Sequence, residues 1–177
     1  KTEFLNPWKS QHKKKIIWAP HHTIPEMSNE LHYSTFLDVA DVMLEIAKEY
    51  TDEIQMAFKP HPFLKKKLYK IWGKERTDIY YQKWVQMETI QFESGEYYGL
   101  FKHSDALIHD CSSFIVEYLY MGNPVMFLCN GGSHTDTLNK FGKSAFNMHV
   151  FGKTRADIEL FIQNVISGVD TSSVDRD

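Results

Sequence analysis

The sequence has few of the residues that define several large classes of protein. It holds two cysteines, Cys111 and Cys129, among 177 residues, and no Cys-x-x-Cys pair. Both lie at the ends of apolar runs, which is typical of free, buried thiols in a cytosolic protein, so nothing calls for a disulfide. Basic residues number 20 against 23 acidic ones. Nucleic-acid binders usually carry a basic excess, so we expect no nucleic-acid partner.

Long apolar runs are also missing. No stretch approaches the ~20 residues that a membrane-spanning helix needs, and no signal peptide is visible. The Gly-x-Gly-x-x-Gly fingerprint, a P-loop and the Gly-x-Ser-x-Gly elbow are absent as well. These absences weaken the dinucleotide-binding, NTPase and serine-hydrolase interpretations in turn.

What remains is the composition of one globular domain. Hydrophobic residues make up 42% of the chain, which argues against disorder, and 177 residues suffice for one well-cored domain. The chain begins at Lys1 rather than Met, and its first residues are polar and basic with no clear period. We expect a lead-in over residues 1–15, a domain over residues 16–168 and a polar tail over residues 169–177, in a fragment of a longer protein.

Apolar runs that fit strands alternate with segments that fit helices. Strands are expected at residues 16–19, 54–58, 89–92, 106–108 and 125–128. Helices are expected at residues 35–50, 63–73, 77–87, 97–102, 113–121 and 154–168, with caps at Thr35, Thr77 and Thr154. Such alternation predicts an α/β fold, a three-layer Rossmann-like domain with a mostly parallel sheet.

The loops that follow these strands carry the polar residues of interest. Right-handed crossovers place such loops at one edge of a parallel sheet, where ligands bind. We therefore expect one crevice, and its candidate residues are His21, His22, Lys59, His61, Asp110, Ser112, Ser113 and His134.

The stretch over residues 104–118 organises the rest of the domain. It predicts a short buried strand, a tight polar turn and the start of a helix, with Asp110, Ser112 and Ser113 capping the first turn. Free backbone N–H groups and the positive end of the helix dipole favour phosphate there. A plain N-cap without a ligand explains the same serines. Glu117, one turn later, either accepts hydrogen bonds from ribose hydroxyls or is a surface charge.

Lys59 and His61 lie in a loop stiffened by Pro60 and Pro62. An imidazole held there can transfer a proton near neutral pH or, as imidazolium, stabilise a leaving phosphate. A loop histidine in water is the alternative. The loop histidines also raise the question of a metal, but no His-x-Glu or Cys-x-x-Cys spacing accompanies them and Asp110 is the one carboxylate beside them. We therefore expect no metal site.

Several segments resemble a known family when they are taken in order. Residues 58–62 (Phe-Lys-Pro-His-Pro), 104–113 (Ser-Asp-Ala-Leu-Ile-His-Asp-Cys-Ser-Ser) and 123–127 (Asn-Pro-Val-Met-Phe) resemble the CDP-glycerol:poly(glycerophosphate) glycerophosphotransferases of teichoic-acid-type synthesis. Residues 18–20, leading into residues 34–36, fit the strand and loop that open that family's second half. The ordered set is fairly specific, whereas the Asp-x-Ser-Ser element alone recurs in other GT-B transferases.

The resemblance implies the C-terminal, donor-binding half of a GT-B fold in an enzyme of the cell envelope. Such an enzyme transfers glycerol phosphate from CDP-glycerol to an acceptor hydroxyl and releases CMP, with no cofactor beyond that donor. By the same resemblance His61 matches a catalytic histidine and Lys59 lies near the pyrophosphate. The other donor-binding residues are Ser112, Ser113, Glu117 and Asp110, and an acceptor or donor loop is offered by His21, His22 and His134.

The implied partners are a nucleotide-activated small-molecule donor, a polymer or lipid-linked acceptor, and the N-terminal half of the same protein. That half carries a second functional histidine in the family, so a fragment without it is expected to bind nucleotide poorly and to turn over little. The implied location is cytoplasmic, with the full-length protein open to peripheral association at the inner face of the cell membrane.

Departures from the family pattern leave the donor open. His109 and Cys111 stand where relatives more often carry Thr or Ile and Tyr, and residues 20–22 differ from the common Ala-Pro-Thr version. CDP-ribitol or another activated group therefore competes with CDP-glycerol. Two further functions stay as alternatives: a GT-B glycosyltransferase that uses a sugar nucleotide, and a non-catalytic nucleotide-binding or interaction domain.

Overall fold

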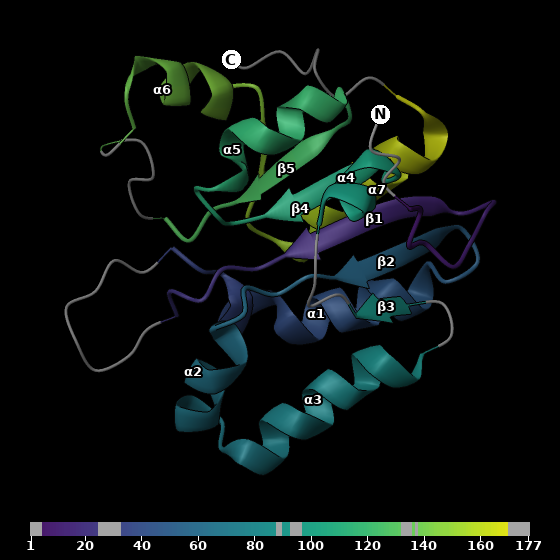
Figure 1. The fold of residues 1–177 in the computed structure, drawn as a ribbon, viewed down its shortest axis with the longest axis vertical. Coiled ribbons are helices and arrows are strands. Elements are labelled where there is room, and N and C mark those ends of the chain that lie inside the picture. The colour runs from purple at the N-terminus through teal and green to yellow at the C-terminus, as the bar shows by residue number, and fades with distance from the viewer. Residues whose placement is uncertain are drawn as a thin grey trace.

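The computed structural model describes residues 5–24, 33–87, 90–92, 97–131, 136 and 138–169. Within them, a single six-stranded sheet runs through the middle of the molecule (Figure 1). Every pairing is parallel, in the order β3-β2-β1-β4-β5-β6. The strands are β1 (Lys14–Ala19), β2 (Ile54–Phe58), β3 (Ile90–Phe92), β4 (Ala106–His109), β5 (Val125–Leu128) and β6 (Val150–Gly152). The predicted Rossmann-like α/β fold is confirmed.

Helices cover both faces of this sheet. They are α1 (Phe36–Glu49), α2 (Leu64–Ile71), α3 (Lys74–Gln86), α4 (Tyr98–Lys102), α5 (Phe114–Glu117), the 3₁₀ helix η1 (Tyr118–Met121), α6 (Lys140–Phe146) and α7 (Arg155–Ser167). Successive side chains of a strand point to opposite faces. Ile16 and Trp18 of β1 accordingly share a buried cluster with α1, α3 and α7, whereas Ile17 and Ala19 share one with α4 (Figure 1).

An aromatic cluster anchors the strand ends from which the functional loops leave. Trp18 stacks on Phe36 of α1 and on Phe58 of β2, with ring centroids 5.7 and 4.9 Å away. Phe58 in turn lies 4.8 Å from Trp84 of α3, and all four side chains are fully buried. Because Trp18 and Phe58 lie at or beside the last residues of β1 and β2, this packing holds the starting points of the two loops in place.

Part of the expected lead-in packs on the face of the sheet that α4 covers. Trp8 is 3% exposed, and its ring N–H donates to the Leu100 carbonyl at 3.1 Å. The Ser10 N–H donates to the Gln55 side chain at 2.8 Å, and β1 already begins at Lys14. The segment from Trp8 onward thus packs with the domain, because burial of the indole ties it to α4. The outer limits of the domain stay a prediction.

Two details of the helices differ from expectation. We expected Thr77 to cap a helix, but α3 begins at Lys74 after Gly73, which has a φ of 81°. Thr77 is instead buried one turn inside, where its hydroxyl donates to the Gly73 carbonyl at 2.8 Å. Helix α6 and strand β6, the edge strand that pairs with β5, were not expected from the sequence.

The last helix forms as predicted. Thr154 caps α7 by accepting from the Asp157 N–H at 3.2 Å, the Asp157 carboxylate accepts from the Thr154 N–H at 2.8 Å, and Gly168 ends the helix with a φ of 69°. This reciprocal pair is a capping box. No helix among the described residues has the length and apolarity to span a membrane.

Candidate functional site

The site forms where the order of the strands reverses. From β1 the chain adds β2 and β3 on one side, and it then places β4 on the other side of β1. The crevice at such a switch point is the usual ligand site of open parallel sheets. Pairing of Trp18 with Phe58 and of Ala19 with His109 brings the loops after β1, β2 and β4 to one edge, as predicted. Residues 93–96 and His134, also expected there, lie outside the described residues.

A cavity of about 380 Å³ opens between these loops, which is a size typical of small-molecule sites. Three of its walls are the loop after β1, the loop after β2 and the turn between β4 and α5, and Tyr97 adds a fourth contact ahead of α4. In chain order the lining residues are Ala19, Pro20, His21, Lys59, Pro60, His61, Pro62, Tyr97, Cys111, Ser113, Phe114 and Glu117. Four separate segments thus build one pocket.

Asp110 ties the loop after β1 to the start of α1. Its carboxylate is 1% exposed and accepts from the His21 N–H at 2.6 Å, from the Thr35 N–H and hydroxyl at 2.6 and 3.0 Å, and from the Ser34 hydroxyl at 3.2 Å. Burial raises the pKa of this carboxyl, and the bonds from Thr35 and His21 oppose that effect. We expected Asp110 to cap α5 and to contact the donor. Both carboxylate oxygens already accept hydrogen bonds from His21, Ser34 and Thr35, so Asp110 positions the loop after β1 and helix α1 instead.

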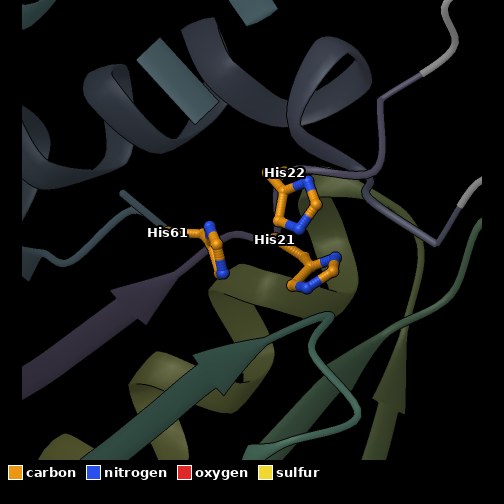
Figure 2. Close-up of side chains that lie close together, drawn as sticks. All are labelled: His21, His22 and His61. Atoms are coloured by element: carbon orange, nitrogen blue, oxygen red, sulfur yellow. The ribbon is translucent and has the colours of Figure 1, made fainter. Parts of the chain in front are cut away.

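Three histidines from two loops gather beside the cavity (Figure 2). The ring centroids of His21 and His22 lie 4.3 Å apart, those of His22 and His61 4.1 Å, and those of His21 and His61 5.1 Å. Burial, followed by the neighbouring rings and nearby lysines, lowers the pKa of His21 and of His61 to about 4. Both rings are therefore neutral at pH 7. The sequence predicted a shared sheet edge for these residues but not their mutual contact.

Lys59 and Glu117 bring opposite charges to the cavity. Lys59 is 8% exposed, and its backbone N–H donates to the Trp18 carbonyl at 2.8 Å, which fixes the start of its loop on β1. The Glu117 carboxylate accepts from the Tyr97 hydroxyl at 3.0 Å. Sequence reasoning did not include Tyr97 in the site, because nothing local marks a residue ahead of a five-residue helix as the partner of Glu117.

The serine pair occupies the turn without the expected caps. Ser113 lines the cavity, but its backbone is already helical, with φ −64° and ψ −31°, and its side chain makes no cap hydrogen bond. Ser112 is exposed and is not among the lining residues. Helix α5 holds only four residues before η1 begins. A phosphate at this turn would therefore depend on hydroxyl and amide donors far more than on a helix dipole.

The two cysteines are free, and burial raises the pKa of both thiols. Cys111 lines the cavity as a neutral, apolar group rather than as a thiolate nucleophile. This agrees with the sequence, which contains no Gly-x-Ser-x-Gly hydrolase motif.

A pair of buried histidines, His109 and His149, lies beside the turn between β4 and α5. This pair was not predicted from the sequence. His109 is 0% exposed, and its Nε2 lies 3.1 Å from Nε2 of His149. Its Nδ1 lies 3.0 Å from the Cys111 carbonyl oxygen and 3.3 Å from the Cys111 backbone nitrogen. Nδ1 of His149 lies 3.1 Å from the Ala145 carbonyl. A neutral His109 makes one of its two Cys111 contacts at a time. When His109 Nε2 donates to His149 and His149 Nδ1 donates to the Ala145 carbonyl, His109 Nδ1 accepts from the Cys111 N–H, whereas the other tautomer of His109 donates from Nδ1 to the Cys111 carbonyl. Burial lowers the pKa of His109 well below its usual value.

The sequence matches the family CDP-Glycerol:Poly(glycerophosphate) glycerophosphotransferase over residues 9–165. The chain belongs to this family. The match covers the three loops of the cavity and strands β1 and β4, between which the order of the strands reverses. The members of the family are transferases. The comparison with curated proteins finds no match.

Solved structures share the fold of this glycerophosphotransferase-family chain at low identity. A UDP-GlcNAc 2-epimerase from Methanocaldococcus jannaschii has a TM-score of 0.56 at 14% identity, covering 86% of this chain and 39% of that one. The UDP-GlcNAc 2-epimerase from Neisseria meningitidis, bound to UDP-GlcNAc, has 0.55 at 15%, covering 92% and 38%. A variant of the wall teichoic acid polymerase TagF has 0.54 at 18%, also covering 92% and 38%. These likenesses show a Rossmann-like domain of the GT-B type, and the chain spans about two fifths of each structure's length.

Proposed function

We propose that this chain is the donor-binding domain of a glycerophosphotransferase that uses CDP-glycerol or a related CDP-alcohol. The observation that carries the proposal is the cavity at the switch point, which collects Lys59 and His61 from the loop after β2 and Ser113 and Glu117 from the turn and helix after β4, inside the region that matches the family. The TagF polymerase structure, which shares the fold, supports a teichoic-acid-type role in the cell envelope.

Each lining group suits one part of such a donor. The Lys59 ammonium and the hydroxyl and amide of Ser113 suit the diphosphate. The Phe63 N–H donates to His61 Nδ1 at 3.1 Å, so the neutral ring carries its proton on Nε2, a donor suited to a phosphate oxygen. The Glu117 carboxylate, oriented by Tyr97, suits ribose hydroxyls.

The proposed transfer is a displacement at phosphorus. The acceptor oxygen bonds to the phosphorus that carries glycerol, the bridging P–O bond to CMP breaks, and CMP keeps that electron pair. The acceptor proton passes to the second functional histidine that the family places in the N-terminal half. Lys59 and His61 stabilise the charge that grows on the leaving phosphate, which is where fixed donors contribute most to catalysis.

The acceptor and the setting belong to the same proposal. A polymer or lipid-linked hydroxyl is the acceptor, and the N-terminal half of the full-length protein closes the other side of the donor site. The full-length enzyme works in the cytoplasm, at the inner face of the cell membrane. The chain described here binds donor weakly and turns over little without that half.

Calorimetric titration of the chain with CDP-glycerol tests the binding step. We expect saturable binding with one site, weakened at least tenfold in Lys59→Ala because a charge-assisted contact to phosphate is lost. Lys66→Ala removes an exposed lysine of α2 and is the matched control, with unchanged affinity expected. Equal affinities in Lys59→Ala and the control would contradict the assignment of the cavity.

Donor screening with the full-length protein tests the chemistry. Transfer from CDP-glycerol, and its loss in a folded His61→Ala variant, is the expected result. Transfer from a UDP- or GDP-sugar with CDP-glycerol inert would establish the glycosyltransferase alternative instead. Full activity of His61→Ala would remove this residue from the mechanism.

A further inference from the structure

The three clustered histidines offer a second chemistry at the edge of the cavity. One ring nitrogen from each of His21, His22 and His61 can be chosen so that all three lie within 4.8 Å of one another. Ligands of a tetrahedral Zn²⁺ with bonds of about 2.0–2.1 Å lie roughly 3.3 Å apart. Small side-chain rotations are therefore enough to close the set on an ion. Figure 2 shows the three rings facing a common space between the loops after β1 and β2.

The backbone around these rings is held in a way that suits coordination. The Asp110 carboxylate accepts a hydrogen bond from the His21 N–H. The His61 N–H donates to the Pro20 carbonyl at 3.0 Å, so a backbone hydrogen bond joins the two loops. His21 Nδ1 lies 2.9 Å from the Thr23 hydroxyl, which also accepts from the Tyr33 N–H at 3.1 Å. A ring that donates from Nδ1 to such an oxygen presents the lone pair of Nε2, the usual arrangement of a metal-bound histidine.

One contact competes with coordination. The Phe63 N–H donates to His61 Nδ1, so an ion that takes this lone pair must displace the amide. The bond is exposed, and water can accept the released N–H at little cost. His61 can thus change from a hydrogen-bonded loop residue to a ligand without leaving a buried group unsatisfied.

The composition of the cluster selects the ion and its fourth ligand. Among the described residues the cluster holds three imidazoles and no carboxylate, a set that favours borderline ions such as Zn²⁺, Co²⁺ or Ni²⁺ over Mg²⁺ and Ca²⁺, which prefer oxygen. The charged neighbours are Lys59 and Lys67, whose positive charges act on these rings. Two cations beside a bound metal ion favour an anion in the remaining coordination position, and the adjoining cavity gives that anion access.

We propose that His21, His22 and His61 form a three-histidine site for a divalent transition metal ion, with its fourth position open to an anionic oxygen ligand from the cavity. The proposal does not rest on the proposed function. The metal takes the Nδ1 lone pair of His61, whereas the proposed phosphate contact uses the proton on Nε2, so the two roles use different nitrogens of the same ring.

Titration of the untagged chain with Co²⁺ and Zn²⁺ tests the site. We expect one Co²⁺ per chain with the visible absorption of four-coordinate cobalt, displaced by Zn²⁺ and not by Mg²⁺. Inorganic phosphate is the probe of the open position, and its addition is expected to change the cobalt spectrum. A titration without a saturable site would overturn the proposal, and a spectrum indifferent to phosphate would overturn its open position.

Variants separate the site from other histidines. His22→Ala is expected to weaken Zn²⁺ binding at least tenfold, and Thr23→Val, which removes the oxygen partner of His21, roughly tenfold. His12→Ala removes an exposed histidine outside the cluster and is expected to bind as the parent does. Circular dichroism checks the fold of each variant. Unchanged zinc affinity in both His22→Ala and Thr23→Val would refute the assignment, and either result leaves the CDP-glycerol titration independent.

Discussion

At the scale of single residues, the position of the His21 loop depends on one buried carboxylate. Asp110 accepts from two backbone amides and two hydroxyls that come from the loop after β1 and the start of α1. Asp110 lies 89 residues from His21 and 75 residues from Thr35 in the sequence, and it joins their two elements at the switch point. Its contribution to the site is therefore indirect, through the place it gives to His21 and Thr35.

Asp110→Ala is expected to lower the free energy of unfolding by roughly 3–5 kcal/mol, because it leaves buried donors without acceptors. Urea denaturation of the parent and the variant measures this. Asp38→Ala removes an exposed carboxylate in the first turn of α1 and is the control, with a loss below about 1 kcal/mol. A loss at Asp110 no larger than that of the control would show that its bonds do not hold the loop.

Some positions in the candidate site could be predicted from the sequence, and others could not. The position of Lys59 and His61 at the cavity was predictable, because strand ends at one edge of a parallel sheet are set by local pattern. The role of Asp110 was not, since its acceptors are filled by residues that only the fold brings near. The same holds for the contact of His22 with His61, which belong to different loops.

At the scale of elements, local signals decided which boundaries were predictable. The helix α7 carries both halves of its capping box and a terminal glycine within its own sequence, and its limits were predicted. The start of α3 was not predicted, because the cap position holds Gly73, which has no side chain. Thr77 is a residue type common at caps, but here its hydroxyl donates to the Gly73 carbonyl one turn earlier. Strand β6 is three residues long and lies at the sheet edge, too short for a period to show.

The capping box of α7 gives a pH-dependent prediction at this scale. The Lys153 and Thr154 N–H groups donate to the Asp157 carboxylate and hold its pKa below its usual value. A depressed carboxyl pKa stabilises the fold above the unfolded pKa of about 3.9, and the effect is lost as the pH falls through the folded value. Asp157→Ala is expected to cost about 1 kcal/mol at pH 7.

Urea denaturation at pH 7 and near pH 2.5 measures the Asp157 effect. The difference between parent and variant is expected to shrink at the lower pH, because protonation removes the charged acceptor from the parent too. A difference of the same size at both pH values would show that the variant acts through something other than the carboxylate.

At the scale of the whole molecule, the order of the strands places every proposed function at one edge. Alternation of strands and helices in the sequence was enough to predict a parallel sheet and its ligand edge. The same edge holds titratable groups that the fold keeps neutral: burial lowers the pKa of His21, His61 and His109. Stability should therefore depend on pH for the molecule as a whole, in a direction set by these histidines.

The sign of that dependence follows from proton uptake on unfolding. An unfolded histidine has a pKa of about 6.5, so below this pH the unfolded chain binds protons that the folded chain does not. Stability is then fully present above pH 6.5 and falls as the pH decreases toward the lowered folded values, about 4 for His21 and His61. The fully buried His109, with its strongly lowered pKa, accounts for about 1.4 kcal/mol between pH 7.5 and 5.5, and the half-buried His21 and His61 each contribute less because solvent screens them.

His109→Gln isolates the contribution of the buried pair. Glutamine offers an amide donor and a carbonyl acceptor to His149 and the Cys111 backbone, but it does not titrate. Urea denaturation is expected to show that the parent loses about 1.4 kcal/mol more than His109→Gln between pH 7.5 and 5.5. His12→Gln, at an exposed position, should keep the parent's full pH dependence. Equal pH losses in the parent and His109→Gln would mean that His109 is protonated within the fold.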